Sequence, residues 1–287
     1  MGKTLFDKIW DSHVISELGN GFVLLHIDRL LLHDLSGARA LREVVEKGYT
    51  PAQPRLIYAT PDHAVSTKPG RTDETFPPGA PLLRGLRENT AKFGIKLFDI
   101  GKDGNGIVHI MGPEQGLSIP GATLVCGDSH TCTHGGMGAL AFGIGSSELE
   151  HVLATQTMVQ RKPKRFRAHF EGKTPQGVTA KDMILHLIGD VGTAAGTGHA
   201  VEYAGSAVRA LSVEARLTLC NLSIEMGART GMVAPDDITF EYLAGRDFAP
   251  KDALWERALA HWRTRPGCLC LPRRPGGPQR RPGSRGR

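Results

Sequence analysis

A carboxylate, a hydroxyl and an imidazole stand side by side near the middle of the chain. Ala122–Cys126 is a short apolar run with the character of a buried strand, and after Gly127 it is followed by Asp128, Ser129 and His130. Open α/β sheets bind ligands at the carboxyl ends of their strands, and this order of residues predicts such a position. The three side chains together can move protons and bind a polar ligand.

A second acid–imidazole pair follows another short apolar run. Pro61 favours an extended conformation in the residue before it and ends the expected strand Arg55–Ala59, so Asp62 and His63 fall on the loop after that strand. Such a pair can act as an oriented acid or base. The simpler alternative is a turn carboxylate that caps its own loop beside a surface histidine.

Two further ionisable residues lie in apolar surroundings. His109 is expected at the edge of an apolar strand over 107–110, where a buried histidine with satisfied hydrogen bonds is the common case. Glu225 lies in an expected helix over 211–228, one turn from Asn221 and so on the same face. A glutamate on a solvated helix face is the usual explanation for Glu225, so neither residue identifies a site by itself.

A zinc site is an alternative use of the central stretch, which holds Cys126, His130, Cys132 and His134. Their spacing matches no common zinc pattern, and the two histidines share a face only within a helix, which we do not expect there. A zinc hydrolase is therefore kept as a separate hypothesis. The glycines of 136–141 fit a loose dinucleotide fingerprint, but no acidic residue follows at the distance that fingerprint needs.

Strand and helix signals alternate around these residues. Periodicity and capping residues predict strands over 22–28, 55–59, 96–100, 107–110, 122–126, 165–171 and 196–203. They predict helices over 4–13, 36–47, 81–93, 180–189, 211–228 and 253–262, and a long one from the glycine-rich stretch to about residue 158. This alternation is typical of a doubly wound α/β fold with polar clusters at the strand ends.

The charge of the chain is concentrated at one end. Of 287 residues, 40% are hydrophobic and 22% charged, with a net charge of +6. Residues 264–287 hold seven arginines and no lysine or acid, so residues 1–263 are close to neutral. This distribution argues against nucleic acid as the partner of the folded part.

The composition of residues 264–287 predicts a disordered tail, because its arginine, proline and glycine cannot bury enough apolar surface to fold. The tail begins abruptly after an amphipathic helix, as a GC-rich gene read in a shifted frame would. A genuine basic arm is the alternative. We therefore divide the chain into a folded region over 1–263 and a tail over 264–287.

No apolar run approaches the ~18 residues of a membrane span, and the start of the chain lacks the order of a secretory signal. The expected location is the cytoplasm, where cysteines stay reduced.

Five motifs together resemble the aconitase superfamily, and within it the large subunits of bacterial isopropylmalate dehydratases. They occur in the family's order, as PDHAVST (61–67), GIVHIMGPEQG (106–116), the stretch 125–156, AGTGHAVEYAG (195–205) and TLCNLSIEMGARTGMVAPD (218–236). The resemblance extends to about residue 263. It implies aconitase-like α/β/α layers with mainly parallel sheets, here incomplete because a third domain would be lacking.

The resemblance also implies a reaction and a partner. The family's hydro-lyase isomerises 2-isopropylmalate to 3-isopropylmalate by dehydration and rehydration, in leucine biosynthesis. It works as a heterodimer with a small subunit, which supplies a serine base, and with a [4Fe-4S] cluster, whose open iron is the Lewis acid. A homoaconitate hydratase is the nearest alternative, since both enzymes use hydroxy-dicarboxylate substrates.

Roles carry over to eight side chains through this resemblance. Asp62 would orient His63 so that the imidazole protonates the departing hydroxyl. Ser129 would contact a substrate carboxylate, and Asn221 would lie near the cluster. Interlocking carboxylate–histidine pairs around cluster and substrate are implied for the remaining four, His109, Asp128, His130 and Glu225.

The chain departs from the family at the cluster ligands. The family's cysteines lie in Gly-Ser-Cys-Thr-Asn and Pro-Gly-Cys-x-x-Cys segments, and neither is present. Residues 266–270 offer only a Cys-x-Cys pair in the tail, and Cys126, Cys132 and Cys220 belong to other motifs. We therefore expect a truncated chain that binds no cluster and has little activity alone. A non-catalytic remnant with a basic, nucleic-acid-binding tail is the competing hypothesis.

Overall fold

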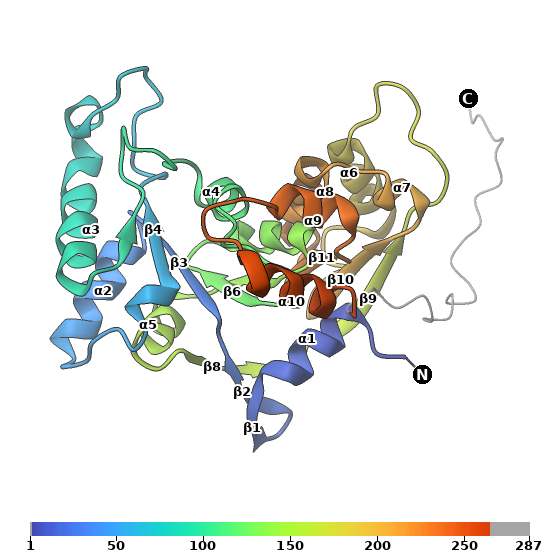
Figure 1. The fold of residues 1–287 in the computed structure, drawn as a ribbon, viewed down its shortest axis with the longest axis horizontal. Coiled ribbons are helices and arrows are strands. Elements are labelled where there is room, and N and C mark those ends of the chain that lie inside the picture. The colour runs from blue at the N-terminus through green and yellow to red at the C-terminus, as the bar shows by residue number, and fades with distance from the viewer. Residues whose placement is uncertain (1, 265–287) are drawn as a thin grey trace.

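The computed structural model describes residues 2–264, which form two parallel β-sheets and a small antiparallel sheet (Figure 1). The expectations for the tail concern residues that lie, apart from Thr264, outside this range. No helix within 2–264 has both the length and the apolar character needed to cross a membrane.

The larger sheet positions the polar clusters of the sequence. Its five strands all run parallel, in the order β5 (Lys96–Leu97), β4 (Ile57–Thr60), β3 (Arg29–His33), β6 (Thr123–Cys126) and β7 (Leu140–Gly143). The chain builds outward from β3 in one direction through β4 and β5, and in the other through β6 and β7. The expected doubly wound arrangement is therefore present, with its switch point between β3 and β6.

Both faces of this sheet are buried. Successive side chains of a strand point to opposite faces, so neighbouring residues of β3 enter different cores. Leu30 and Leu32 contribute to the core under helices α1 (Leu5–His13), α2 (Gly37–Glu46), α3 (Ala80–Phe93) and α5 (Ser146–Thr155). Leu31 packs in a separate core with helix α4 (Val108–Glu114).

The second sheet carries the other half of the fold. Its parallel strands lie in the order β11 (Thr230–Val233), β10 (His199–Ala204) and β9 (Lys164–His169), and their core includes residues of α6 (Ala180–Val191) and α8 (Val213–Asn221). Short α7 (Ser206–Arg209) follows β10. Helices α9 (Asp237–Leu243) and α10 (Asp252–Trp262) pack together through stacked Phe240 and Trp262.

An antiparallel sheet connects the two halves. It consists of β1 (Val14–Gly19), β2 (Phe22–His26) and β8 (Thr157–Arg161), and β8 leads into β9 within a few residues (Figure 1). Short 3-10 helices lie at Pro54–Leu56, Asp73–Thr75 and Pro77–Gly79.

A nine-residue 3-10 helix, η4 (Ser129–Met137), bridges the halves directly. A Cβ atom added at Gly135 would lie 1.7 Å from the carbonyl oxygen of Gly231 in β11. Only glycine therefore allows η4 to approach the second sheet so closely.

Three sequence predictions of elements were wrong in kind. The expected strand over 22–28 is present as β2, but the site-bearing strand β3 that follows it was not predicted. The long helix expected up to residue 158 is divided into η4, β7, α5 and β8. Leu140–Gly143 is rich in small residues and looks helical locally, but burial between neighbouring elements imposes a strand.

The other two errors concern helices near the site. The expected strand over 107–110 is the first turn of α4, and His109 lies in that turn. The expected helix over 211–228 ends at Asn221 and tightens into a 3-10 turn, η5 (Leu222–Met226). Asn221 and Glu225 therefore do not share a helix face as predicted.

Candidate active site

Ionisable side chains gather where β3, β4 and β6 end, at the switch point of the larger sheet. His33 ends β3 and is followed by Asp34, β4 is followed by Asp62 and His63, and β6 is followed by Asp128. The convergence of these strand ends is the position in which open α/β sheets bind ligands.

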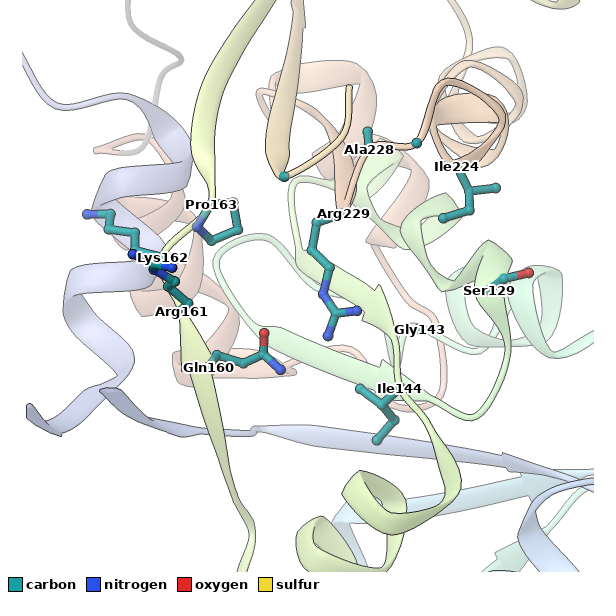
Figure 2. Close-up of a pocket in the computed structure, with 12 residues that line it drawn as sticks. Ser129, Gly143, Ile144, Gln160, Arg161, Lys162, Pro163, Ile224, Ala228 and Arg229 are labelled. Carbon is teal, nitrogen blue, oxygen red and sulfur yellow. The ribbon is translucent and has the colours of Figure 1, made fainter. Parts of the chain in front are cut away.

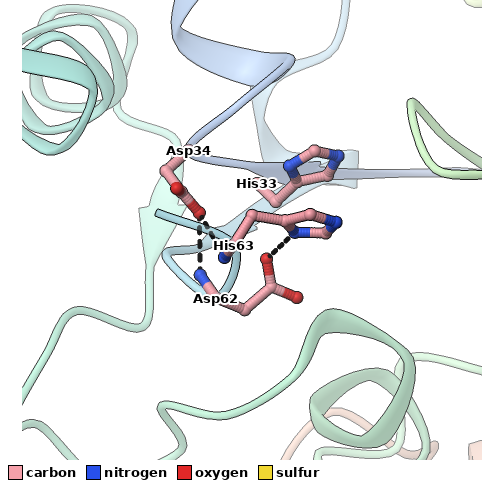
Figure 3. A group of neighbouring side chains, drawn as sticks. All are labelled: His33, Asp34, Asp62 and His63. Atoms are coloured by element: carbon pink, nitrogen blue, oxygen red, sulfur yellow. Dashed lines mark hydrogen bonds and ion pairs between the residues drawn. The ribbon is translucent and has the colours of Figure 1, made fainter. Parts of the chain in front are cut away.

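Asp34 holds the loop after β4 in place (Figure 3). Its Oδ1 accepts the backbone N–H groups of Asp62 at 2.8 Å and His63 at 3.0 Å, and its Oδ2 accepts that of Ala64 at 2.6 Å. Burial alone would raise the pKa of Asp34, but the three amides outweigh it and keep the pKa below its ordinary value. The loop therefore depends on an ionised, fully engaged carboxylate.

The His63 imidazole lies between two carboxylates. Its Nδ1 is 2.5 Å from Oδ1 of Asp62 and its Nε2 is 2.8 Å from Oδ2 of Asp128. Carboxylates only accept, so both ring nitrogens carry protons. The hydrogen bonds to Asp128, and then to Asp62, raise the pKa of His63 to about 10. His33 stacks on this imidazolium with ring centroids 4.0 Å apart.

Asp128 is the junction of the cluster. Its Oδ2 accepts from His63, while its Oδ1 accepts from Nε2 of His109 at 2.8 Å and from the backbone N–H of His130 at 2.7 Å. Burial acts to raise the pKa of Asp128. The bonds from His109 and His63 outweigh this and hold the pKa well below its usual range.

Asp62 also positions the helix that carries His109. Its Oδ2 accepts the backbone N–H of Val108 at 2.7 Å, in the first turn of α4. His109 is buried, as its apolar surroundings predict, yet it also contacts Asp128. The buried and the functional interpretations of His109 are therefore compatible.

A more exposed pair lies beside this cluster. Nε2 of His130 is 3.2 Å from Oε1 of Glu225, and Nδ1 of His130 is 3.1 Å from Oγ of Ser129. Asn221 stays apart from the charged groups, because its side-chain amide donates to Oγ1 of Thr133 at 2.8 Å. The structure thus brings together seven of the eight predicted site residues and leaves Asn221 at the edge.

A cavity of about 530 Å³ opens beside Ser129 and Ile224 (Figure 2). Its walls include Arg161, Lys162 and Arg229, and none of the described residues that line it is acidic. The Arg229 side chain extends toward Gln160, its guanidinium lies 4.8 Å from the centre of the Phe142 ring, and burial lowers its pKa. No acidic residue within 2–264 forms an ion pair with this guanidinium, which favours an anionic ligand.

The zinc alternative finds no support in the geometry. The ring nitrogens of His134 face Ser118 and His109, and those of His130 face Ser129 and Glu225. Within residues 2–264 the one group with ligand atoms close enough for a metal is His33, Asp34, Asp62 and His63. Asp34 and His63 already use their polar atoms on the partners described above.

The described cysteines do not fit an iron–sulfur cluster either. Cys126, Cys132 and Cys220 are buried free thiols, and burial raises the pKa of each, that of Cys132 to about 12. They therefore stay protonated, whereas cluster ligands are thiolates. Cys268 and Cys270 lie outside the described residues.

Sequence reasoning missed four members of the network: His33, Asp34, Ser118 and His134. His33 and Asp34 follow the run Leu30–Leu32, which is the same signal of a buried strand and a polar turn that identified the other two clusters. No local pattern marks Ser118, and the spacing of His134 suggests only a zinc ligand.

Comparison with known proteins identifies relatives over nearly the whole described region. Residues 7–268 match the family model of the aconitase family (aconitate hydratase). The large subunit 1 of 3-isopropylmalate dehydratase from Bradyrhizobium diazoefficiens is 59% identical over 263 residues, which cover 92% of this chain and 55% of that protein. The large subunits from Roseiflexus castenholzii and Cytophaga hutchinsonii are 51% and 49% identical, over 93% and 92% of this chain and 57% of each of those proteins.

The chain therefore spans about half the length of the curated relatives that it matches. These identities and the mostly parallel α/β sheets confirm the family resemblance seen in the sequence motifs. The chain belongs to the aconitase family.

Proposed function

We propose that this chain carries the proton-transfer part of an isopropylmalate dehydratase large subunit, a hydro-lyase that converts 2-isopropylmalate into 3-isopropylmalate. The observation that carries the proposal is His63, held as an imidazolium between Asp62 and Asp128. Dehydration requires a proton for the departing hydroxyl, and an oriented imidazolium supplies one. The relatives' names supply the substrate.

The proton leaves from Nε2 of His63. Asp62 retains Nδ1, and a substrate hydroxyl that approaches the site replaces Asp128 at Nε2. While both carboxylates are in contact, a pKa of about 10 holds the proton too tightly for ready transfer. Loss of the Asp128 contact weakens that hold, so substrate binding itself makes His63 a better acid. The proton and the departing hydroxide leave as water.

The cavity beside Ser129 is proposed to take a carboxylate of the substrate. Arg229 supplies a guanidinium that forms no ion pair with residues 2–264, although the charge of Glu148 acts on it, and Ser129 supplies a hydroxyl next to the His130–Glu225 pair. A cavity of about 530 Å³ is in the range of small-molecule sites. His109 and Asp128 remain proposed members of the site, and Asn221 a proposed residue at its edge.

The remaining chemistry is assigned outside the described residues. In the family a [4Fe-4S] cluster acts as the Lewis acid, but the cysteines described here do not fit one, so no step above depends on it. We propose a small-subunit partner that supplies the base for the C–H proton, a cytoplasmic location, and little turnover by this chain alone. Homoaconitate hydration is the second candidate.

Binding of substrates to the full 287-residue chain tests the proposal without requiring turnover. NMR of the histidine rings would be followed during titration with 2-isopropylmalate, 3-isopropylmalate and homoaconitate. We expect the isopropylmalates to shift the His63 and His130 signals, and the variant His63→Gln to bind more weakly. His186→Gln, at an exposed histidine of α6, is the matched control.

Two results would overturn the proposal. If neither isopropylmalate binds, the chain is a remnant without a substrate site. If homoaconitate alone binds, the second candidate replaces the first. Turnover by the chain, after anaerobic iron–sulfide treatment and addition of a small subunit, would refute the separate expectation that no cluster forms.

A further inference from the structure

One buried histidine of the cluster has no role in the mechanism above. His134 lies on η4 with no exposed surface, between Ser118 and His109. Its Nδ1 is 2.7 Å from Oγ of Ser118, and its Nε2 is 3.2 Å from Nδ1 of His109. The chain of contacts therefore continues from Asp128 through His109 and His134 to Ser118.

The positions of the protons along this series of hydrogen bonds follow from the groups at its two ends. Asp128 is an ionised acceptor, so Nε2 of His109 carries a proton. When His109 is neutral, its Nδ1 is an acceptor and the N–H at Nε2 of His134 donates to it. The Nδ1 of His134 then accepts the hydroxyl proton of Ser118. Every polar atom of the two rings has a partner in this arrangement.

The same chain accommodates one more proton. If His109 becomes an imidazolium, its Nδ1–H donates to Nε2 of His134, which then carries its proton on Nδ1 and donates it to Oγ of Ser118. His134 stays neutral in both states, because burial and the neighbouring His109 lower its pKa well below the ordinary value. A hydroxyl both donates and accepts, so Ser118 suits either state.

His134 and Ser118 both pack closely against Gly112 of α4. A Cβ atom added at Gly112 of α4 would lie 2.7 Å from Cε1 of His134 and 2.9 Å from Oγ of Ser118. The backbone of α4, which carries His109, is therefore in contact with both residues. Ring rotation of His134 would leave buried nitrogens without partners, which costs free energy.

We propose that Ser118 and His134 are positioning residues that fix the ring orientation and the Nε2–H tautomer of His109. They give Nδ1 of His109 a hydrogen-bond partner while its Nε2–H bond to Asp128 stays intact. This role rests on the proposed function, because it matters to turnover only if the Asp128 cluster is catalytic. The tautomers themselves exist without substrate, and they are measured separately from substrate binding.

Long-range ¹H–¹⁵N correlation spectra of the full chain, labelled in histidine, report the tautomer of each ring. We expect the Nε2–H tautomer for both His109 and His134 at neutral pH. In Ser118→Ala the hydroxyl donor to Nδ1 of His134 is lost, so the tautomer ratio of His134 shifts about fivefold toward Nδ1–H. Ser118→Thr keeps a hydroxyl and restores the native ratio. His151→Gln, at an exposed position of α5, leaves both ratios unchanged.

The native spectrum alone can overturn the proposal, so a variant that fails to fold does not protect it. In the native chain, Nδ1–H as the main tautomer of His109, or of His134 while His109 is neutral, contradicts the assigned chain of donors. An unchanged tautomer ratio in a folded Ser118→Ala variant shows that Ser118 does not position His134. Weak substrate binding together with the expected tautomers would instead reject the proposed function and leave the positioning role in place.

Discussion

Replacement of Asp128 by asparagine tests the central claim that two carboxylates hold His63 in its charged form. Asparagine keeps the size of the side chain and one carbonyl acceptor but removes the negative charge. In the native chain a pKa of about 10 leaves ~99% of His63 protonated at pH 8, whereas an ordinary histidine is ~3% protonated at that pH. The protonated fraction of His63 in the variant should lie between these two values at pH 8.

The contact with Asp128 determines how the pKa of His63 should change in the variant. The hydrogen bond to Asp128 is the largest single cause of the raised pKa of His63, so Asp128→Asn should lower that pKa toward the value of an ordinary histidine. The protonated fraction of His63 at pH 8 should therefore fall well below ~99% in the variant, toward the ~3% of an ordinary histidine. Asp62→Asn removes the second carboxylate and should also lower the pKa of His63.

The assay is an NMR titration of the His63 ring from pH 5 to pH 11 in the native chain and each variant. Asp190→Asn, which alters an exposed carboxylate next to His186, should leave the His63 curve unchanged. An ordinary pKa for His63 in the native chain would refute the reasoning. So would an unchanged His63 titration curve in a folded Asp128→Asn variant.

Three more outcomes follow from the structure. The pKa of His63 is raised in the folded chain, so its contribution to stability is complete below pH ~6.5 and is lost as the pH rises through about 10. The free energy of unfolding in urea should therefore fall over that pH range, and it should fall more in the native chain than in Asp128→Asn. Asp236→Ala should cost ~3–5 kcal/mol in urea unfolding, because it leaves the fully buried Arg216 without its carboxylate, whereas Asp237→Ala removes only an exposed ion pair and should cost less than ~1 kcal/mol. Gly135→Ala should lower stability by ~2–3 kcal/mol, since its methyl group would meet the carbonyl of a neighbouring strand, while Gly106→Ala has free space and should change little in the same denaturation experiment.

The strand ends of the larger sheet could be predicted from sequence because each has a local cause. An apolar run followed by a proline or by a glycine and an acid marks the end of a buried strand, and this identified the loops that carry Asp62 and Asp128. The same rule missed Asp34. The apolar pattern predicts one strand over 22–28, and the turn that separates β2 from β3 has no proline or glycine to mark it.

Other parts of the site depend on contacts that no short pattern encodes. The Asp62 carboxylate contacts the first turn of α4, 46 residues later, and the expected strand over 107–110 is a helix there. Ser118 contacts His134 only because Gly112 lets the two elements meet. Such features arise from packing between distant segments, and a single sequence does not show which segments will touch.

The pairing of β3 with β6 has a consequence for how the chain acquires its fold. Arg29 pairs with Leu124, so the centre of the larger sheet closes a loop of more than ninety residues. Contacts of such large sequence separation slow folding, because the entropy of closing the loop is lost before the contacts form. During synthesis, β3 and β4 leave the ribosome well before β6. Until β6 is available, the edge of β3 that pairs with it has no partner and the leucines of β3 are exposed. We expect this interval to be the one in which the nascent chain most needs protection from aggregation.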